Sequence, residues 1–390
     1  MTPEDAAAAL RTTDAVRDRA GHLLHRARAG DSAWFTVVDD ALDSAARIVA
    51  ELTRARYPDL TIPFHSRWRH FEAGGVHRAE GLAGNPRAMI DLAVVSVLLD
   101  AGAGADWTFS EDASGQRFSR SEGLAVASWH AFADGVFSSD PDDPLRVDAA
   151  GLQALTTERL GAAFQVRADN PLVGLDGRVA LLHRLGSALA DSDVFAGRPG
   201  GLFDALATPG RTVRAHDILT VLLTELSSIW LSGNSIGDQP LGDCWRHPAA
   251  GGEGLTRGWV PFHKLSQWLT YSLLEPFTWA GVPVAGVDAL TGLPEYRNGG
   301  LLLDTGVLTL RESGCAGRTW QVGDELIVEW RALTVALLDE LAPVVCARLG
   351  VDMPLACVLE GGTWAAGRRL AQELRGGAPP LTTDSDGTVF

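Results

Sequence analysis

The stretch "GDELIVEWRALTVALLDELAPVV", residues 323–345, decides the fold class of this chain. Its apolar residues recur at intervals of three and four, which places them on one side of an α-helix. The apolar stripe consists of Leu326, Trp330, Leu333, Leu337 and Leu341. A stripe of this length predicts an amphipathic helix that packs against a hydrophobic core.

The same helical period recurs along most of the chain. Helices are expected within residues 2–30, 37–58, 85–104, 121–135, 148–164, 178–191 and 216–233, and after Pro261. Several of these segments end where helices normally stop, at a glycine or before a proline. The best strand signal is "GLLLDTGVLTL", residues 300–310, which fits a short hairpin. We therefore expect a mainly α protein, a single large helical domain with long polar loops and at most a few short strands.

The chain shows no internal repeat, no low-complexity linker and no break in composition, so residues 1–390 are expected to form one domain. The acidic, proline-bearing segment "SSDPDDPLRVD", residues 138–148, is the strongest candidate for an internal boundary. It would separate an N-terminal helical subdomain, residues 1–140, from a C-terminal subdomain, residues 150–390. The alternative is that this segment is a surface loop.

Composition and charge narrow the class of partner. Of the 390 residues, 46% are hydrophobic and 21% are charged, as in a globular protein. The formal net charge of −16 argues against nucleic acid as a partner, since a phosphate backbone requires a basic face. A small-molecule substrate is expected instead, and association into homo-oligomers stays open.

Three features indicate a cytoplasmic protein. The 4 cysteines show no CxxC spacing, which favours a reducing compartment over a disulfide scaffold. The N-terminus "MTPEDAAAAL" lacks the basic and apolar regions of a signal peptide. Finally, no stretch approaches the ~20 apolar residues of a membrane-spanning helix, so no membrane partner is expected.

The polar segment "TIPFHSRWRHFEAGGVHR", residues 61–78, concentrates cationic and aromatic side chains in a net-acidic chain. Arg67, Arg69 and Arg78 suit planar anions such as phosphate or carboxylate. The adjacent glycines Gly74 and Gly75 let backbone amides approach a ligand. The alternative is a structural loop whose arginines pair with the many carboxylates of the protein, and the sequence leaves both open.

Neither a metal nor a cofactor is indicated. His65, His70 and His77 are separated by five and seven residues, which matches no standard metal site. The glycines of "DAGAGADWTF", residues 100–109, do not fit a nucleotide-binding fingerprint, and the segment leaves a helix instead of opening one.

A polar stripe interrupts the apolar helix after Pro261. The stripe begins at Lys264 and continues with Gln267, three residues later, and Tyr271, seven residues later. A lysine on a mostly apolar helix is costly unless it is paired or extends its amine to solvent. The loop before this helix, "GNSIGDQPLGDCWRHP", residues 233–248, adds candidate carboxylates.

The segment "LTGLPEYRNGGLLLDTGVL", residues 290–308, contains the best candidate for acid–base chemistry. Glu295 follows a proline and precedes Tyr296, Arg297 and a glycine pair. A carboxylate held on a tight turn beside an arginine and a phenol is a candidate acid or base. The alternative is that Glu295 and Arg297 cap neighbouring helices.

Several motifs together resemble one known family. They are "IPFHSRWRHFEAGGVHR", "NPLVGLDGRVALLHRLG", "RPGGLFD", "LPEYRNGGLLLDTGVL" and the terminal "SDGTVF". These stretches, which span nearly the whole chain, resemble the fungal and bacterial uracil-catabolism family (URC pathway, urg-type) of unknown-function proteins. The resemblance implies cytosolic pyrimidine degradation, in which uracil becomes a nucleotide, its ring is opened and urea is released.

A remoter resemblance covers about the last third of the chain. "FHKLSQWL", "LPEYRNGG" and "DTGVL" follow one another in the order and at the spacing of motifs in the queuosine-salvage nucleotide N-glycosidase family. Lys264 matches the helix lysine of that family. Glu295 stands where that family has aspartate, and Leu265–Ser266 replace arginine–alanine, so the detailed geometry is expected to differ.

Our hypothesis is hydrolysis of an N-ribosidic bond in ribosylurea or its 5′-phosphate, which yields urea and ribose or ribose 5-phosphate. Such bonds break through a state with positive charge on the sugar, so a carboxylate is needed near the anomeric carbon. Glu295 is assigned this role, and Lys264 would orient it or contact a ribose hydroxyl. Asp243 or Asp238 would bind ribose hydroxyls or assist the departure of urea.

Further residues are assigned to substrate binding. The phosphate would be held by Arg67, Arg69 and Arg78. The remaining substrate-binding candidates are His65, Trp68, Glu72, Tyr296, Arg297 and Asp386.

Two alternative functions stay open. One is an amidohydrolase, with or without a metal, that acts on the opened pyrimidine; it would normally need a metal cluster or an activated nucleophile, and none of the cysteines lies in a recognisable catalytic motif. The other is a non-catalytic pathway scaffold, against which the dense polar loops argue, because interaction surfaces more often expose apolar patches.

Overall fold

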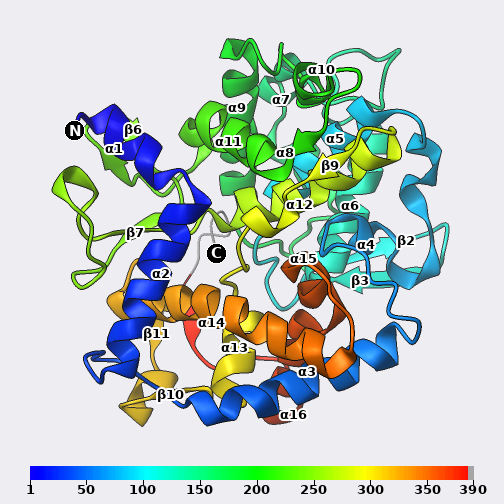
Figure 1. The fold of residues 1–390 in the computed structure, drawn as a ribbon. Coiled ribbons are helices and arrows are strands. Elements are labelled where there is room, and N and C mark those ends of the chain that lie inside the picture. Colours follow the sequence, from blue (N-terminus) through cyan, green and yellow to red (C-terminus); the bar gives the residue numbers. More distant parts are fainter. Residues whose placement is uncertain (385–390) are drawn as a thin grey trace. The chain divides into compact units, whose positions relative to one another are not determined.

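The computed structural model of the protein describes residues 1–384. These residues form two compact units. Unit 1 comprises Met1–His65, Asn234–Lys264 and Val287–Asp384, and unit 2 comprises Ser66–Gly233 and Leu265–Gly286. Both units are built mainly from helices, with strands of at most four residues, so the predicted mainly α fold class is confirmed (Figure 1). Residues 138–148 lie inside unit 2, and a subdomain division near them stays a prediction.

Unit 1 contains the long helix that the opening stretch predicts. Its helices are α1 (Pro3–Leu10), α2 (Thr13–Arg28), α3 (Leu42–Arg56), α13 (Tyr296–Asp304), α14 (Glu325–Leu349), α15 (Leu355–Val358) and α16 (Trp364–Arg375). A π-helix, η8 (Leu359–Thr363), joins α15 to α16. Short 3-10 turns are η1 (Asp39–Ala41), η5 (Gly254–Thr256), η6 (Val287–Ala289) and η7 (Ser313–Gly317).

Helix α14 is the central helix of unit 1, and α2 and α3 pack along it (Figure 1). It ends at Gly350, whose φ of 74° is the left-handed conformation that commonly closes a helix. The predicted stripe is buried, but so is a second side of the helix, where Val328 and Val335 pack against Val16 of α2. The sequence therefore predicted the helix but not the burial of its second side.

The N-terminal region differs from the single helix expected over residues 2–30. Helix α1 ends at Leu10, and α2 starts again at Thr13. The cause is Thr12, whose extended backbone and side-chain hydroxyl form a new N-cap, with Oγ1 accepting from the Ala15 amide at 3.1 Å.

The strands of unit 1 pair in twos. Antiparallel pairs are β1 (Phe35–Val37) with β10 (Leu308–Leu310), β5 (Ser235–Ile236) with β6 (Gln239–Pro240), and β7 (Cys244–Arg246) with β8 (Trp259–Pro261). Strand β11 (Thr319–Gln321) runs parallel to β12 (Thr382–Asp384).

The hairpin expected over residues 300–310 is wrong. Residues 300–304 belong to helix α13, and within this segment only β10 is a strand, paired with distant β1. The leucine run fits either structure, and the N-cap at Glu295 starts a helix whose Leu301 and Leu302 are buried.

Unit 2 is also helical. Its helices are α4 (Trp68–Phe71), α5 (Pro86–Leu98), α6 (Arg120–Ala133), α7 (Ala149–Gln153), α8 (Thr157–Ala163), α9 (Leu175–Asp191), α10 (Gly201–Leu206), α11 (Ala215–Glu225) and α12 (Lys264–Trp279), whose first residue belongs to unit 1. Its 3-10 turns are η2 (Ala73–Gly75), η3 (Arg78–Leu82) and η4 (Ser227–Ile229). Strands β2 (Thr108–Glu111) and β3 (Gln116–Ser119) are antiparallel, and β4 (Val213–Arg214) and β9 (Val284–Ala285) are parallel.

The core of unit 2 is organised by α5, in which every residue from Ala88 to Leu98 is buried. Its one carboxylate, Asp91, accepts hydrogen bonds from the amides of Val147 and Gly200. A buried carboxylate with such partners ties the helix to two loops. Within residues 1–384, no helix is both long and apolar enough to span a membrane.

Candidate functional site

A buried ion pair in unit 1 joins the start of α12 to the turn before α13. Arg331 of α14 donates from both terminal nitrogens to the Asp243 carboxylate, at 2.8 and 2.8 Å. Asp243 Oδ2 also accepts from the Lys264 amide at 2.9 Å, and Arg331 Nε donates to the Pro294 carbonyl at 3.4 Å. Of the predicted catalytic residues, Asp243 thus bonds the Lys264 backbone amide, and Glu295 directly follows Pro294, whose carbonyl accepts from Arg331.

Asp243 holds this cluster together as an ionised carboxylate. Its burial would raise its pKa, but Arg331 and hydrogen bonds from the Lys264 amide and the Trp245 indole bring the pKa below its usual value. Since Arg331 engages both oxygens, the geometry makes Asp243 a residue that positions others.

The backbone just before Lys264 is strained. His263 has a φ of 51°, in the left-handed region that a non-glycine residue seldom adopts. Its Nε2 lies 2.9 Å from the Leu10 carbonyl, and the amides of Phe262 and His263 both donate to the Asp243 carbonyl. Strain that the surroundings hold in place is common at functional sites.

Glu295 is the N-cap of α13 and is half-buried. Its Oε2 accepts from the Arg297 amide at 2.8 Å, and its Oε1 accepts from the Asn298 amide at 2.6 Å. The carboxylate is thereby fixed at the positive end of a helix, while each oxygen keeps a second lone pair. This geometry agrees with the capping interpretation, and the catalytic role of Glu295 stays a prediction.

The residues after Glu295 pack against α16. The Arg297 guanidinium lies 4.0 Å from the centroid of the Trp364 ring, and its Nε donates to the Tyr296 hydroxyl at 3.1 Å. Gly367 makes this packing close, because a Cβ there would lie 2.0 Å from the Arg297 carbonyl oxygen.

A second buried carboxylate of unit 1, Glu360, lies on the π-helix η8. It accepts from His65 Nδ1 at 2.8 Å, from Arg56 at 2.8 Å and from the Tyr57 hydroxyl at 2.9 Å. Burial alone would raise the pKa of Glu360, but His65, Arg56 and Tyr57 lower it to about 2. Single-turn π-helices are frequent at functional sites.

An aromatic contact connects this carboxylate to the turn at Glu295. The His65 ring lies 6.1 Å from the Trp364 ring, and the Arg297 guanidinium packs on that same Trp364 ring. Six of the predicted residues lie in unit 1, namely His65, Asp243, Lys264, Glu295, Tyr296 and Arg297. Asp238 is exposed in the β5–β6 turn, where it contacts its neighbour Gln239, and Asp386 lies outside the described residues.

The three arginines predicted to hold phosphate lie in unit 2, each paired with a carboxylate of that unit. The pairs are Arg67–Asp100, Arg69–Glu275 and Arg78–Glu111, with N–O distances of 3.0, 3.0 and 2.6 Å. The hydrogen bonds from Arg78 contribute most to lowering the pKa of Glu111 to about 2. The alternative of a structural loop explains this geometry, and phosphate binding by these arginines stays a prediction.

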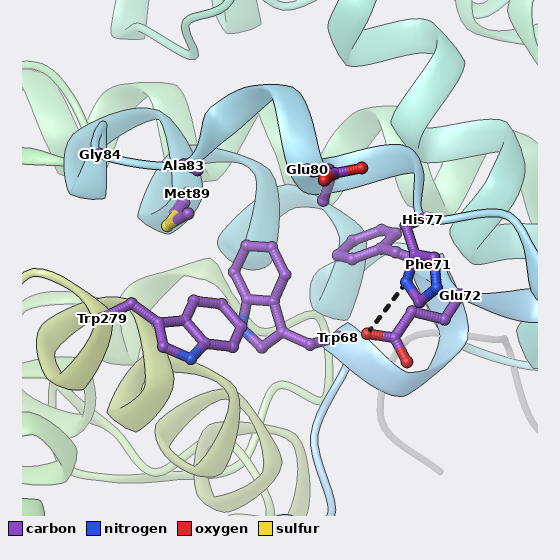
Figure 2. Close-up of a pocket in the computed structure, with 10 residues that line it drawn as sticks. Trp68, Phe71, Glu72, His77, Glu80, Ala83, Gly84, Met89 and Trp279 are labelled. Atoms are coloured by element: carbon purple, nitrogen blue, oxygen red, sulfur yellow. Dashed lines mark ion pairs between the residues drawn. The ribbon is translucent and has the colours of Figure 1, made fainter.

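The polar segment nevertheless lines a pocket in unit 2, with a volume of about 450 Å³ (Figure 2). Its side chains include two predicted substrate-binding residues, Trp68 and Glu72, together with Phe71, His77 and Glu80. The remaining lining residues are Ala79, Ala83, Gly84, Met89 and Trp279. The Trp68 and Trp279 rings meet edge to face at 5.0 Å.

His247, Glu325 and Glu329 offer ligand atoms within 4.8 Å of one another, the one such group found among residues 1–384. His247 Nε2 lies 3.1 Å from Glu329, and its Nδ1 accepts from the Ala249 amide at 3.2 Å. The ring proton of a neutral His247 is therefore on Nε2, directed at Glu329. A metal-binding histidine normally donates from its other nitrogen, so this group better fits a hydrogen-bonded pair.

Sequence reasoning missed Arg331, Glu360 and Trp364. The only local signal for the last two was a glycine pair in "LEGGTW", residues 359–364. A glycine pair often marks a close approach of two backbone segments. Gly362 confirms this, because a Cβ there would lie 2.5 Å from the Val49 carbonyl oxygen of α3.

Comparison with known proteins places the chain in a family. Residues 9–390 match the family model described as "Protein of unknown function (DUF1688)". The chain belongs to this family. It is 40% identical over 413 residues to "Protein urg3" of Schizosaccharomyces pombe, covering 100% of both chains. It is 39% identical over 398 residues to "Uracil catabolism protein 4" of Lachancea kluyveri, covering 90% of each.

These matches confirm the resemblance to the uracil-catabolism family that the motifs indicate. The remoter resemblance to the queuosine-salvage N-glycosidases stays a prediction.

Proposed function

We propose that this protein acts in uracil catabolism as an N-ribosyl hydrolase that converts ribosylurea or its 5′-phosphate to urea and ribose or ribose 5-phosphate. The printed name of the Lachancea kluyveri relative supports the pathway. The observation that supports the proposed reaction is the Asp243–Arg331 ion pair. It bonds the Lys264 amide and the Pro294 carbonyl, and so fixes the backbone at Lys264 and next to Glu295.

The reaction breaks the bond between the sugar C1 and a urea nitrogen. The bonding electrons leave with that nitrogen, which takes a proton, while water adds its oxygen to C1 and loses a proton. Positive charge builds on the sugar ring before water adds, so an ionised carboxylate near C1 lowers the barrier. The α13 amides keep Glu295 in one orientation, and its remaining lone pairs face this charge or accept the proton from water.

The neighbours of Glu295 have supporting roles. Lys264 contacts a ribose hydroxyl or orients Glu295, and Asp243 fixes the Lys264 backbone by accepting from its amide. His65, Tyr296 and Arg297 bind the sugar or the urea group, since they lie in the same network of side chains in unit 1.

The test is to incubate the purified protein with synthetic ribosylurea and with its 5′-phosphate and to measure urea. Glu295→Gln is expected to lower the rate by about 100-fold or more. The weakened cap, which keeps one of its two acceptor oxygens, is expected to cost at most about 1 kcal/mol of folding stability. The matched control is Asp148→Asn in unit 2, since Asp148 is also an N-cap that accepts from two backbone amides, those of Ser139 and Gly151.

Two outcomes would contradict the proposal. One is no urea from either compound while an intact pyrimidine nucleotide is cleaved. The other is equal activity of Glu295→Gln and Asp148→Asn, because both variants replace a capping carboxylate by an amide but only one removes the proposed catalytic carboxylate.

A second candidate is a metal-dependent amidohydrolase that acts on the opened pyrimidine. The His247, Glu325 and Glu329 group supplies the ligand types that such an enzyme needs, although the hydrogen bonds of His247 favour a pair with Glu329. Elemental analysis of the purified protein, with His247→Ala as the control, separates the two. Stoichiometric metal that is lost in the variant together with activity would support the amidohydrolase, and activity that survives metal removal would support the ribosyl hydrolase.

A further inference from the structure

The pocket of unit 2 has two chemically different ends. Figure 2 shows the Trp68 and Trp279 indoles at one end, near Met89. At the other end Phe71 lies beside the Glu72–His77 pair, and Glu80 lies above it. A ligand that fills this pocket would therefore meet aromatic and apolar surface along its body and carboxylates at one end.

The charge of the pocket is set by its glutamates. The Glu72 carboxylate lies 4.0 Å from His77 Nδ1, at the limit of an ion pair, and the side chains of Glu72 and His77 are 44% and 69% exposed. Glu80 is also exposed, and no ion pair or hydrogen bond of its side chain is found among the described residues. The arginine nearest to Glu80 in the sequence is Arg78, and it forms an ion pair with Glu111.

Trp279 adds a second sign that the pocket binds a ligand. About half of this residue is exposed (49%), although tryptophan is on average highly buried, and its ring packs on Trp68. An indole face attracts a cation through its negative quadrupole, and tryptophan does so more strongly than other aromatic residues. Carboxylates at the opposite end add attraction for the same charge and repel phosphate.

We propose that this pocket binds a compact organic cation of the alkylammonium class, whose charged group with its alkyl substituents lies against Trp68 and Trp279 and is attracted further by Glu72 and Glu80. A volume of about 450 Å³ is within the range for small-molecule sites. This site lies in unit 2, whereas the cluster around Glu295 lies in unit 1, and it does not rest on the proposed hydrolase activity.

The test uses choline as the probe and 3,3-dimethylbutan-1-ol as its neutral isostere. The full-length protein is labelled with 5-fluorotryptophan, and the ¹⁹F resonances of Trp68 and Trp279 are assigned with Trp→Phe variants. Choline is expected to shift these two resonances and to bind about tenfold more tightly than the isostere, because the two differ only in charge.

Two variants and a control complete the experiment. Trp279→Ala is expected to weaken choline binding by about fivefold or more, and Glu80→Gln by about threefold. Asp106→Asn removes one exposed charge elsewhere in unit 2 and is expected to leave binding unchanged. Circular dichroism checks that all three variants stay folded.

Three results would overturn the proposal. The first is equal affinity for choline and its isostere, which would mean that the pocket recognises only apolar volume. The second is a stronger response of the same resonances to inorganic phosphate or ribose 5-phosphate, which would mean an anion site. The third is an equal effect of Glu80→Gln and Asp106→Asn, which would mean attraction by the net charge of the protein alone.

Discussion

Replacing Glu360 by glutamine removes one buried negative charge while keeping the shape of the side chain. In the structure this carboxylate accepts hydrogen bonds from His65, Arg56 and Tyr57 at the same time. A glutamine offers one acceptor oxygen in place of two and brings donor hydrogens toward groups that are themselves donors. The variant is therefore expected to fold less stably than the wild type at neutral pH.

The size of the effect follows from the pKa of Glu360. Its neighbours lower that pKa to about 2, from an ordinary value of 4.5. At 1.36 kcal/mol per pKa unit, this difference corresponds to about 3 kcal/mol of stability. Because the pKa is lower in the folded state, the contribution is complete above pH 4.5 and is lost as the pH falls toward 2. By pH 3 only about 1 kcal/mol of it should remain.

The assay is urea-induced unfolding followed by circular dichroism, for the wild type and Glu360→Gln, at a series of pH values from 7 to 3. The difference in unfolding free energy between the wild type and Glu360→Gln, here called the stability gap, is expected to be constant from pH 7 to about pH 5.5 and to narrow below pH 4.5. Glu312→Gln is the control, since Glu312 is an exposed carboxylate of unit 1. A gap that keeps its size from pH 7 to pH 3, or that matches the control at pH 7, would refute this reasoning.

The remaining predictions concern the packing around Glu295. Gly367→Ala should destabilise the protein by about 2 kcal/mol or more, and reduce ribosylurea turnover, because its Cβ would collide with the Arg297 carbonyl. Gly21→Ala is the matched control, a helical glycine whose added Cβ would meet no atom within 4 Å, and it should instead raise stability by about 0.5–1 kcal/mol. The measurement is the melting temperature of each variant. An equal change of melting temperature in Gly367→Ala and Gly21→Ala would contradict the predicted collision. Asp243→Asn should cost about 3–5 kcal/mol, because Arg331 keeps its buried charge without a full partner. A loss below about 1 kcal/mol in urea unfolding would contradict the assigned ion pair.

The helices of this protein could largely be predicted, because their apolar period is a local property of the sequence. Helix α5 reads as a buried segment closed by glycines, and the structure buries it fully from Ala88 to Leu98. The break between α1 and α2 was missed since it depends on one hydroxyl at Thr12, without the glycine or proline that usually marks a helix end. The run after Gly300 was misassigned because three successive leucines fit a strand and a helix equally well.

Charge pairing could not be predicted in the same way. Arg69 and Glu275 form an ion pair across 206 positions of sequence, and Arg331 meets Asp243 across 88. No local pattern contains such information, so arginines that are paired inside the fold resemble arginines that await an anion. The composition of residues 61–78 indicated a phosphate site, whereas the pocket that they line presents glutamates.

The most direct test is a crystal structure of the protein with its proposed products, urea and ribose 5-phosphate. The ribose C1 is expected at about 3.5 Å from a carboxylate oxygen of Glu295, a separation suited to reaction, with a hydroxyl near Lys264. A sugar bound elsewhere, with Glu295 still capping α13 and touching no ligand atom, would contradict the proposed hydrolase.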